Sequence, residues 1–143
     1  MTEAFDAEDA PALTREELVA MAPEAWANFR FQAAPSRKLL TCAWPVHAIR
    51  ERFDREDAEA VWDEAPRLAD ETTHIRVWRS EERVRYRAIA RIELESLGAA
   101  RAGETFAVIC DRLVSAVGEA AAASQAAALV SAWVSDGLLA RML

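Results

Sequence analysis

The apolar and polar positions alternate in the centre of the chain. Residues 74–79 and 83–89 each switch between apolar and polar side chains, as a β-strand with one buried face does. The polar connection between them, from Ser80 to Glu82, has the length of a hairpin turn. This pattern predicts a hairpin whose second strand has Val84, Tyr86 and Ala88 on one face and Arg83, Arg85 and Arg87 on the other.

After the hairpin, apolar residues recur three and four positions apart, which predicts helices. The first is expected from near Ile92 to near Gly103, and the second over residues 105–117 with Thr105 as N-cap. A third follows an alanine-rich linker and ends at Asp136-Gly137, after which Leu138-Leu139 packs back on the core. A hairpin followed by three helices predicts a winged-helix unit over residues 67–143, and an α+β fold class.

The N-terminal half predicts a helical and extended segment over residues 13–66. It combines a capping box at Thr14–Glu17 and a helix from Pro23 that carries Trp26, Phe29 and Phe31. A strand or extended segment over residues 37–44 and a helix that begins at Pro45 follow. The acidic stretch from Asp54 to Glu64 is expected to be helix or irregular connection, ended by Pro66. Residues 1–12 show no periodicity and are expected to form a mobile acidic tail.

Composition and charge narrow the possible functions. The 143 residues are 52% hydrophobic, enough for a core, and the net charge of −7 opposes non-specific DNA binding by the whole chain. No apolar run is long enough to span a membrane, and the acidic N-terminus lacks a signal-peptide pattern, so we expect a cytoplasmic protein. Cys42 and Cys110 lie among apolar neighbours and are expected to be buried thiols, not a disulfide.

The sequence offers no catalytic or metal-binding motif. Cys42 and His47 lie five residues apart across a proline, which is not a zinc-ligand spacing, and His74 has no partner at a ligand spacing. The four glycines form no phosphate-binding loop, and the acids of residues 54–63 resemble a solvated face. We therefore expect no enzyme activity, no metal and no cofactor in this chain.

Several short motifs resemble the HvfC/BufC-type proteins, which are often labelled putative DNA-binding proteins. They span about residues 18–143 and are Pro35-Ser36-Arg37-Lys38-Leu39-Leu40, Trp44-Pro45-Val46, His74-Ile75-Arg76-Val77-Trp78-Arg79, Val84-Arg85-Tyr86-Arg87, Glu93-Leu94-Glu95-Ser96-Leu97, Gly103-Glu104-Thr105-Phe106 and Trp133-Val134-Ser135-Asp136-Gly137-Leu138-Leu139. The segment before Pro35 is shorter than the N-terminal helical region usual in that family.

This resemblance implies a role in the modification of ribosomally made peptides. Related proteins such as the methanobactin partner MbnC assist multinuclear non-haem iron oxidases with a TIM-barrel fold. By that likeness, the chain would hold a precursor's leader peptide and present its cysteines to the oxidase, as a heterodimer in which the iron belongs to the partner. The hairpin and three helices are also similar to PqqD, a small peptide chaperone.

A PqqD-like unit would bind an extended peptide along the edge of its hairpin. The expected edge strand is 83–89, where Tyr86 and the arginines Arg83, Arg85 and Arg87 would meet an acidic leader peptide. The opposite wall would come from Gln125, Leu129 and Trp133. Two alternatives stay open: the arginines equally protect a free edge from aggregation, and Trp133 is more often a core residue.

The candidate interface with the oxidase is aromatic: Trp26, Phe29, Phe31 and Trp44, although these side chains would equally fill the junction between the two halves of the chain. A winged helix also suggests a DNA-binding regulator, but the expected recognition helix over residues 105–117 has only Arg112 as a base, with Asp111 and Glu104 beside it. A plain assembly scaffold without a peptide ligand is the third hypothesis.

Overall fold

A computed structural model describes residues 11–35, 37–53, 72–80 and 82–140 of the chain. Most of the predicted acidic tail, and all of the acidic stretch 54–64 with Pro66, lie outside these residues. The described part contains both helices and a sheet, so the α+β class predicted from the sequence is confirmed.

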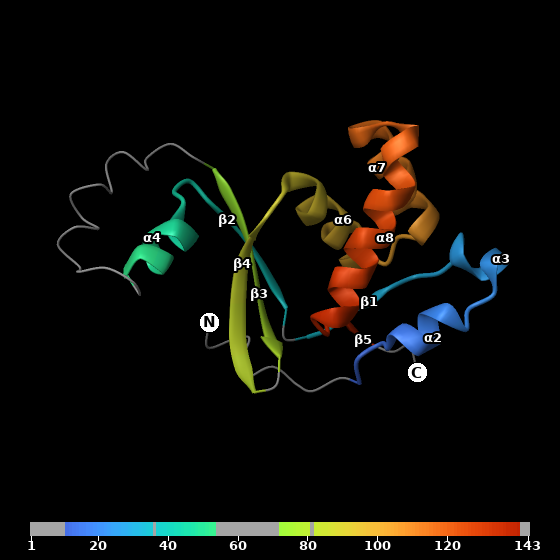
Figure 1. Cartoon of the computed structure of the whole chain (residues 1–143), viewed down its shortest axis with the longest axis horizontal. Helices are drawn as coiled ribbons and strands as arrows, with labels where there is room; N and C mark the ends of the chain where they lie inside the picture. Colours follow the sequence, from blue (N-terminus) through green and yellow to red (C-terminus); the bar gives the residue numbers. More distant parts are fainter. Residues whose placement is uncertain (1–10, 36, 54–71, 81, 141–143) are drawn as a thin grey trace.

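The sheet has three strands in the order β2-β3-β4 (Figure 1). Strands β3 (Thr73–Ser80) and β4 (Arg83–Ile89) form the predicted antiparallel hairpin, with Ser80 opposite Arg83. Strand β2 (Lys38–Cys42) is antiparallel to the other side of β3. The strand or extended segment expected over residues 37–44 is thus a strand at Lys38–Cys42, and the sheet takes strands from both sides of residue 66.

The register of the strands separates two faces of the sheet. Ile75 and Val77 point to the face that also carries Val84 and Tyr86, and this small apolar cluster lies on the side of helix α4 (Val46–Phe53). The opposite face, which carries Trp78, joins the main core under the C-terminal helices. Figure 1 shows α4 on one side of the sheet and these helices on the other.

Three helices follow the sheet and carry most of the core. They are α6 (Arg91–Arg101), α7 (Phe106–Val117) and α8 (Glu119–Ser135). Gly118 separates α7 from α8. Its φ of 81° is a backbone conformation that residues with a Cβ rarely adopt. The prediction of an alanine-rich linker was wrong, because those alanines form the first turns of α8. Alanine has the highest intrinsic helix propensity.

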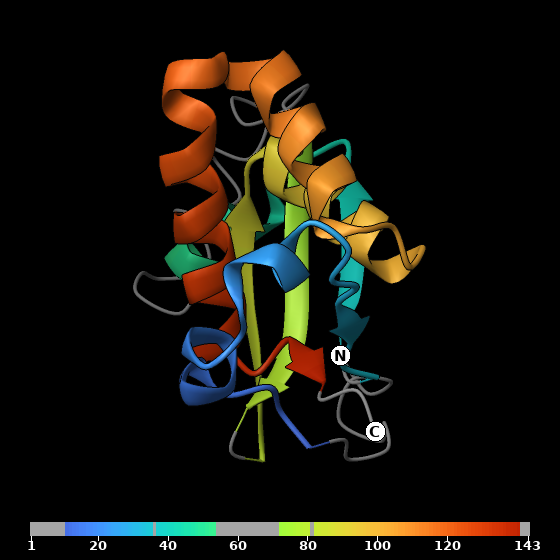
Figure 2. The same cartoon turned by 90° about the vertical axis from the view of Figure 1, so that its right-hand side faces the viewer.

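The N-terminal segment wraps around this helical layer (Figure 2). The predicted capping box is confirmed at α2 (Arg15–Val19), where Thr14 accepts from the Glu17 backbone and the Glu17 carboxylate accepts from the Thr14 backbone. Helix α3 (Pro23–Trp26) is shorter than predicted. The next residues are extended: Arg30 forms a β-bridge with Thr105, so Phe29 and Phe31 do not continue the helix of Trp26.

A second, two-stranded sheet joins the N- and C-terminal segments. Strand β1 (Gln32–Ala33) is antiparallel to β5 (Leu139–Ala140), and Ala12 bridges Ala140. Leu138 and Leu139 are fully buried, which confirms that this pair packs back on the core.

Candidate functional site

Strand β4 lies at the end of the three-stranded sheet, with β3 as its only neighbour among the described strands. Ser80 and Arg83 are paired across a two-residue connection, so the Arg83 N–H points toward β3, as in a β-turn. Antiparallel ladders alternate, so the N–H groups of Val84, Tyr86 and Ala88 point away from the sheet. Figure 2 shows α8 on the β4 side of the molecule.

The three arginines of β4 lie on the face that looks toward the helices. The pairing places Arg85 opposite Trp78 and Arg87 opposite Arg76, and all three arginines are exposed. Arg87 donates from Nη2 to both carboxylate oxygens of Glu93, at 2.9 and 3.0 Å. The alternation predicted from the sequence is confirmed. Arg87 differs from Arg83 and Arg85 because its pairing with Glu93 leaves it only partly available to a peptide.

A buried ion-pair network lies directly behind this edge. Arg76, on β3, is fully buried and donates from Nη1 to Glu93 at 2.8 Å and from Nη2 to Asp136, which follows α8. Its guanidinium carbon stacks 4.3 Å from the centroid of the Trp78 ring. The network therefore links β3, β4, α6 and the end of α8.

Desolvation lowers the pKa of Arg76 from its ordinary value, while the charges of Asp136 and Glu93 oppose this effect. The sequence reasoning missed these three residues. Arg76 alternates like the surface arginines, and Glu93 and Asp136 are 17 and 60 residues away from it. The available signal was its position one residue from Val77 and two from Trp78, in a strand now seen to be buried on both faces.

The α8 residues predicted as the opposite wall of the groove are mostly core residues. Trp133 is fully buried, Leu129 is buried and Gln125 is half-buried. A buried side chain has no surface to offer a peptide, so of these three residues only Gln125 keeps a surface that a peptide could contact. For Trp133 the structure shows the core position that the sequence had left as the alternative.

The aromatic residues predicted as a partner interface mainly join the N-terminal segment to the helices. Phe31 is buried and packs edge-on against Phe106 and Trp133, with ring centroids 5.6 and 6.1 Å apart. Trp26 and Phe29 are half-buried in the same cluster. Trp44 differs, because 48% of it is exposed, so it keeps the surface that an interface needs.

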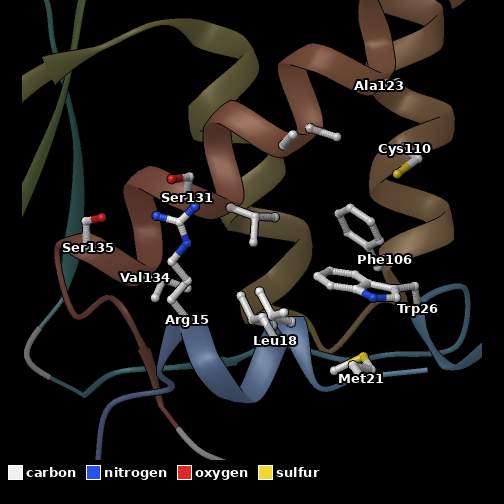
Figure 3. Close-up of a pocket in the computed structure, with 14 residues that line it drawn as sticks. Arg15, Leu18, Met21, Trp26, Phe106, Cys110, Ala123, Ser131, Val134 and Ser135 are labelled. Atoms are coloured by element: carbon white, nitrogen blue, oxygen red, sulfur yellow. The ribbon is translucent and has the colours of Figure 1, made fainter. Parts of the chain in front are cut away.

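An apolar pocket of about 670 Å³ lies between α2, α7 and α8 (Figure 3). Trp26 and Phe106 form one wall of this pocket, and Leu18 on α2 forms another. Arg15 extends from α2 toward Ser131 and is the only charged residue among the described lining residues. The volume and the mainly apolar lining of this pocket are within the range of pockets that bind small molecules or a partner's side chain.

Cys110 lines the same pocket and gives a simple chemical test of it. Desolvation, and then the charge of Asp111, raise the pKa of the Cys110 thiol. Because the thiolate is the reactive form, we expect iodoacetamide to alkylate Cys110 several-fold more slowly in the folded protein than in urea at the same pH. Mass spectrometry of the C42S variant measures this rate, and equal rates in both states would contradict the raised pKa.

Helix α7 carries little positive charge for contact with DNA. Its one basic residue, Arg112, forms an ion pair with Glu104 at 2.6 Å, and Asp111 next to it is exposed. A recognition helix relies on several basic or amide side chains. The geometry therefore gives the DNA-binding hypothesis no added support.

Within the described ranges, no three His, Cys, Asp or Glu side chains are grouped so that they could hold a metal ion. His74 contacts Thr41 instead, with 3.1 Å between Nδ1 and Oγ1. Among the helices that the structure describes, none is both long and apolar enough to cross a membrane.

Comparison of the chain with protein-family profiles, with curated proteins and with solved structures finds no match.

Proposed function

We propose that the chain is a non-catalytic partner protein that binds an acidic leader peptide by strand addition at β4. The observation that carries this proposal is the position of β4 at the end of the sheet, with exposed arginines beside outward-pointing N–H groups. On this proposal, the three-stranded sheet and helices α6 to α8 serve as a winged-helix, PqqD-like recognition unit.

A peptide strand added to β4 would gain two kinds of contact. Its carbonyl groups accept from the outward N–H groups of Val84 and Tyr86, which supplies affinity without regard to side chains. Its acidic side chains pair with the guanidinium groups of Arg83 and Arg85, which supplies selectivity for a negative peptide. Gln125 on α8 is the candidate for a further polar contact.

The oxidase role of the partner rests on the sequence resemblance, and the structure supplies surfaces that suit a partner. Trp44, Leu40 and Val46 are exposed apolar residues around the start of α4. Val19 is 77% exposed on the rim of the apolar pocket that Trp26 lines. Exposed aromatic and aliphatic anchors of this kind are typical of protein interfaces.

Titration of the full chain with an acidic leader peptide tests the proposal. The peptide is the leader segment of a cysteine-bearing precursor that should be encoded next to this protein, together with a TIM-barrel iron oxidase. We expect micromolar binding, with exchange broadening or shifts centred on the amides of 83–89 in an NMR titration. Binding that leaves these amides unchanged would contradict strand addition at β4.

The contribution of charge is tested by the double variant R83Q/R85Q. We expect its affinity for the leader peptide to fall about tenfold, and the remaining binding to depend less on salt. Arg87 is left in place because it is bound to the buried Glu93, and its loss would disturb the fold as well as the edge. A control for charge elsewhere on the surface is R91Q, which removes one exposed arginine of α6 that pairs with Glu95.

Unchanged affinity in R83Q/R85Q would show that the arginines only protect the edge from aggregation. A similar loss in R91Q would show that the net charge of the protein matters and that the β4 edge does not.

A further inference from the structure

A second pocket, of about 520 Å³, lies where β1, the start of β2 and the end of α6 meet. Four basic residues line it: Arg30, Arg37, Lys38 and Arg101. No aspartate or glutamate is among the described residues of this lining. This concentration of positive charge is unexpected on a chain with a net charge of −7.

Arg37 is the central member of this group. Only 7% of the residue is exposed, and its Nη1 atom has no hydrogen-bond partner in the part of the chain that the structure describes. A buried guanidinium without an acidic partner is costly, and buried polar groups in native proteins are nearly always paired with protein, water or an ion. Among the described residues, Nη1 of Arg37 therefore lacks an acceptor, which a ligand would supply.

The surroundings of Arg37 further disfavour its positive charge. Desolvation, followed by the like charges of Arg101 and Arg76, lowers the pKa of Arg37 to about 10. At neutral pH the group is still charged, so the folded protein holds a cation in a place that disfavours cations. An anion in the pocket would favour the charged form of Arg37 and so raise its pKa again.

Hydrogen bonds to the backbone fix the positions of these basic residues. The backbone of Arg30 forms a β-bridge with Thr105, and its side chain donates from Nη1 to the Gly103 carbonyl. The Arg37 N–H donates to the Ala34 carbonyl at 3.2 Å. Arg101 is the last residue of α6. The pocket is thus formed by three segments that are held together by backbone contacts.

We propose that this pocket binds a small molecule through its phosphate or diphosphate group. Arginine forks match the oxygens of a phosphoryl group, and a dianion or trianion is a better counterpart for several cations than a single carboxylate is. The pocket is larger than a phosphate alone, so the phosphate would be part of a larger ligand. This site lies outside the β4 edge and does not depend on the peptide-binding proposal.

Inorganic diphosphate is the probe for this site. We expect calorimetric titration of the full chain at constant ionic strength to show binding, and the Tm to rise by several degrees at saturating diphosphate. The R37Q variant should bind at least about tenfold more weakly. Without diphosphate, R37Q should melt at the same temperature or higher, because it removes a buried charge that has no acidic partner within the described ranges.

Two matched variants separate the possible results. R91Q removes the same charge far from the pocket, and R83Q/R85Q removes charge from the β4 edge; both should bind diphosphate as the unaltered protein does. Diphosphate binding that is no stronger than chloride binding, or that persists in R37Q, would overturn the proposal. Tighter binding of a hexaglutamate peptide than of diphosphate, lost in R37Q, would also overturn it, because the pocket would then be a peptide site.

Discussion

The replacement of Arg76 by methionine is expected to lower the free energy of unfolding by about 3 kcal/mol. Methionine keeps much of the volume and its sulfur can still contact the Trp78 ring, so the main loss is charge and hydrogen bonding. Glu93, which is 5% exposed, would lose one of its two arginines, and Asp136 would lose the fully buried partner that holds the end of α8. Urea unfolding followed by tryptophan fluorescence measures the change.

The double variant R76M/E93M shows whether charge pairing is the cause. Removal of both partners takes away the buried Glu93 carboxylate, while Arg87 and Asp136, which lose their partners, are exposed enough to be hydrated instead. Apolar replacements of buried ion pairs are often neutral or stabilising. We therefore expect R76M/E93M to be more stable than R76M alone, with a coupling energy of about 1–3 kcal/mol. A loss below about 1 kcal/mol in R76M would mean that the network contributes little beyond an ordinary polar contact.

This network is also the part of the molecule that local periodicity in the sequence does not reveal. Local periodicity identified the hairpin, because the alternation of 83–89 is visible within seven residues. It cannot identify which strand lies beside β3 on its other side. The pairing of β2 with β3 and the packing of α6 and the end of α8 on the Trp78 face are both long-range, and in this setting Arg76 is fully buried and not a surface residue.

The errors in the helices have equally local causes. The alanines after Gly118 have weak amphipathic contrast, so they resembled a linker, although alanine has the highest intrinsic helix propensity. Trp26 and Phe29 have helical spacing, but Phe29 and Phe31 reach the core from an extended segment that is held by Arg30. Spacing alone does not distinguish these two ways of burying aromatic rings.

The candidate peptide site was partly predictable for the same reason. Arg83, Arg85 and Arg87 share a face because strands alternate, which sequence shows directly. The interaction of Arg87 with Glu93, and the burial of Leu129 and Trp133, depend on tertiary packing. The basic pocket around Arg37 draws on segments far apart in the chain, and nothing in the local pattern marks them as neighbours.

The sharpest test of strand addition is the substitution of Val84 by proline. Proline removes the outward-pointing N–H of Val84 and places its ring where the added strand would lie, while the ladder between β3 and β4 does not use that N–H. Proline is tolerated on edge strands for this reason. We expect the binding free energy of the leader peptide to weaken by about 2–3 kcal/mol, which is a roughly 30- to 150-fold loss of affinity.

The matched control is V84A, which loses the same contacts with the apolar cluster of Ile75 and Val77 but keeps the N–H. Because strand addition depends on the backbone, V84A should bind the peptide nearly as the unaltered protein does, and both variants should show similar losses of stability. If V84P and V84A bind equally well, the peptide does not extend the sheet at β4. Binding lost equally in both would instead mean that the ligand reads the valine side chain, and the edge of the sheet would no longer explain how this protein holds a peptide.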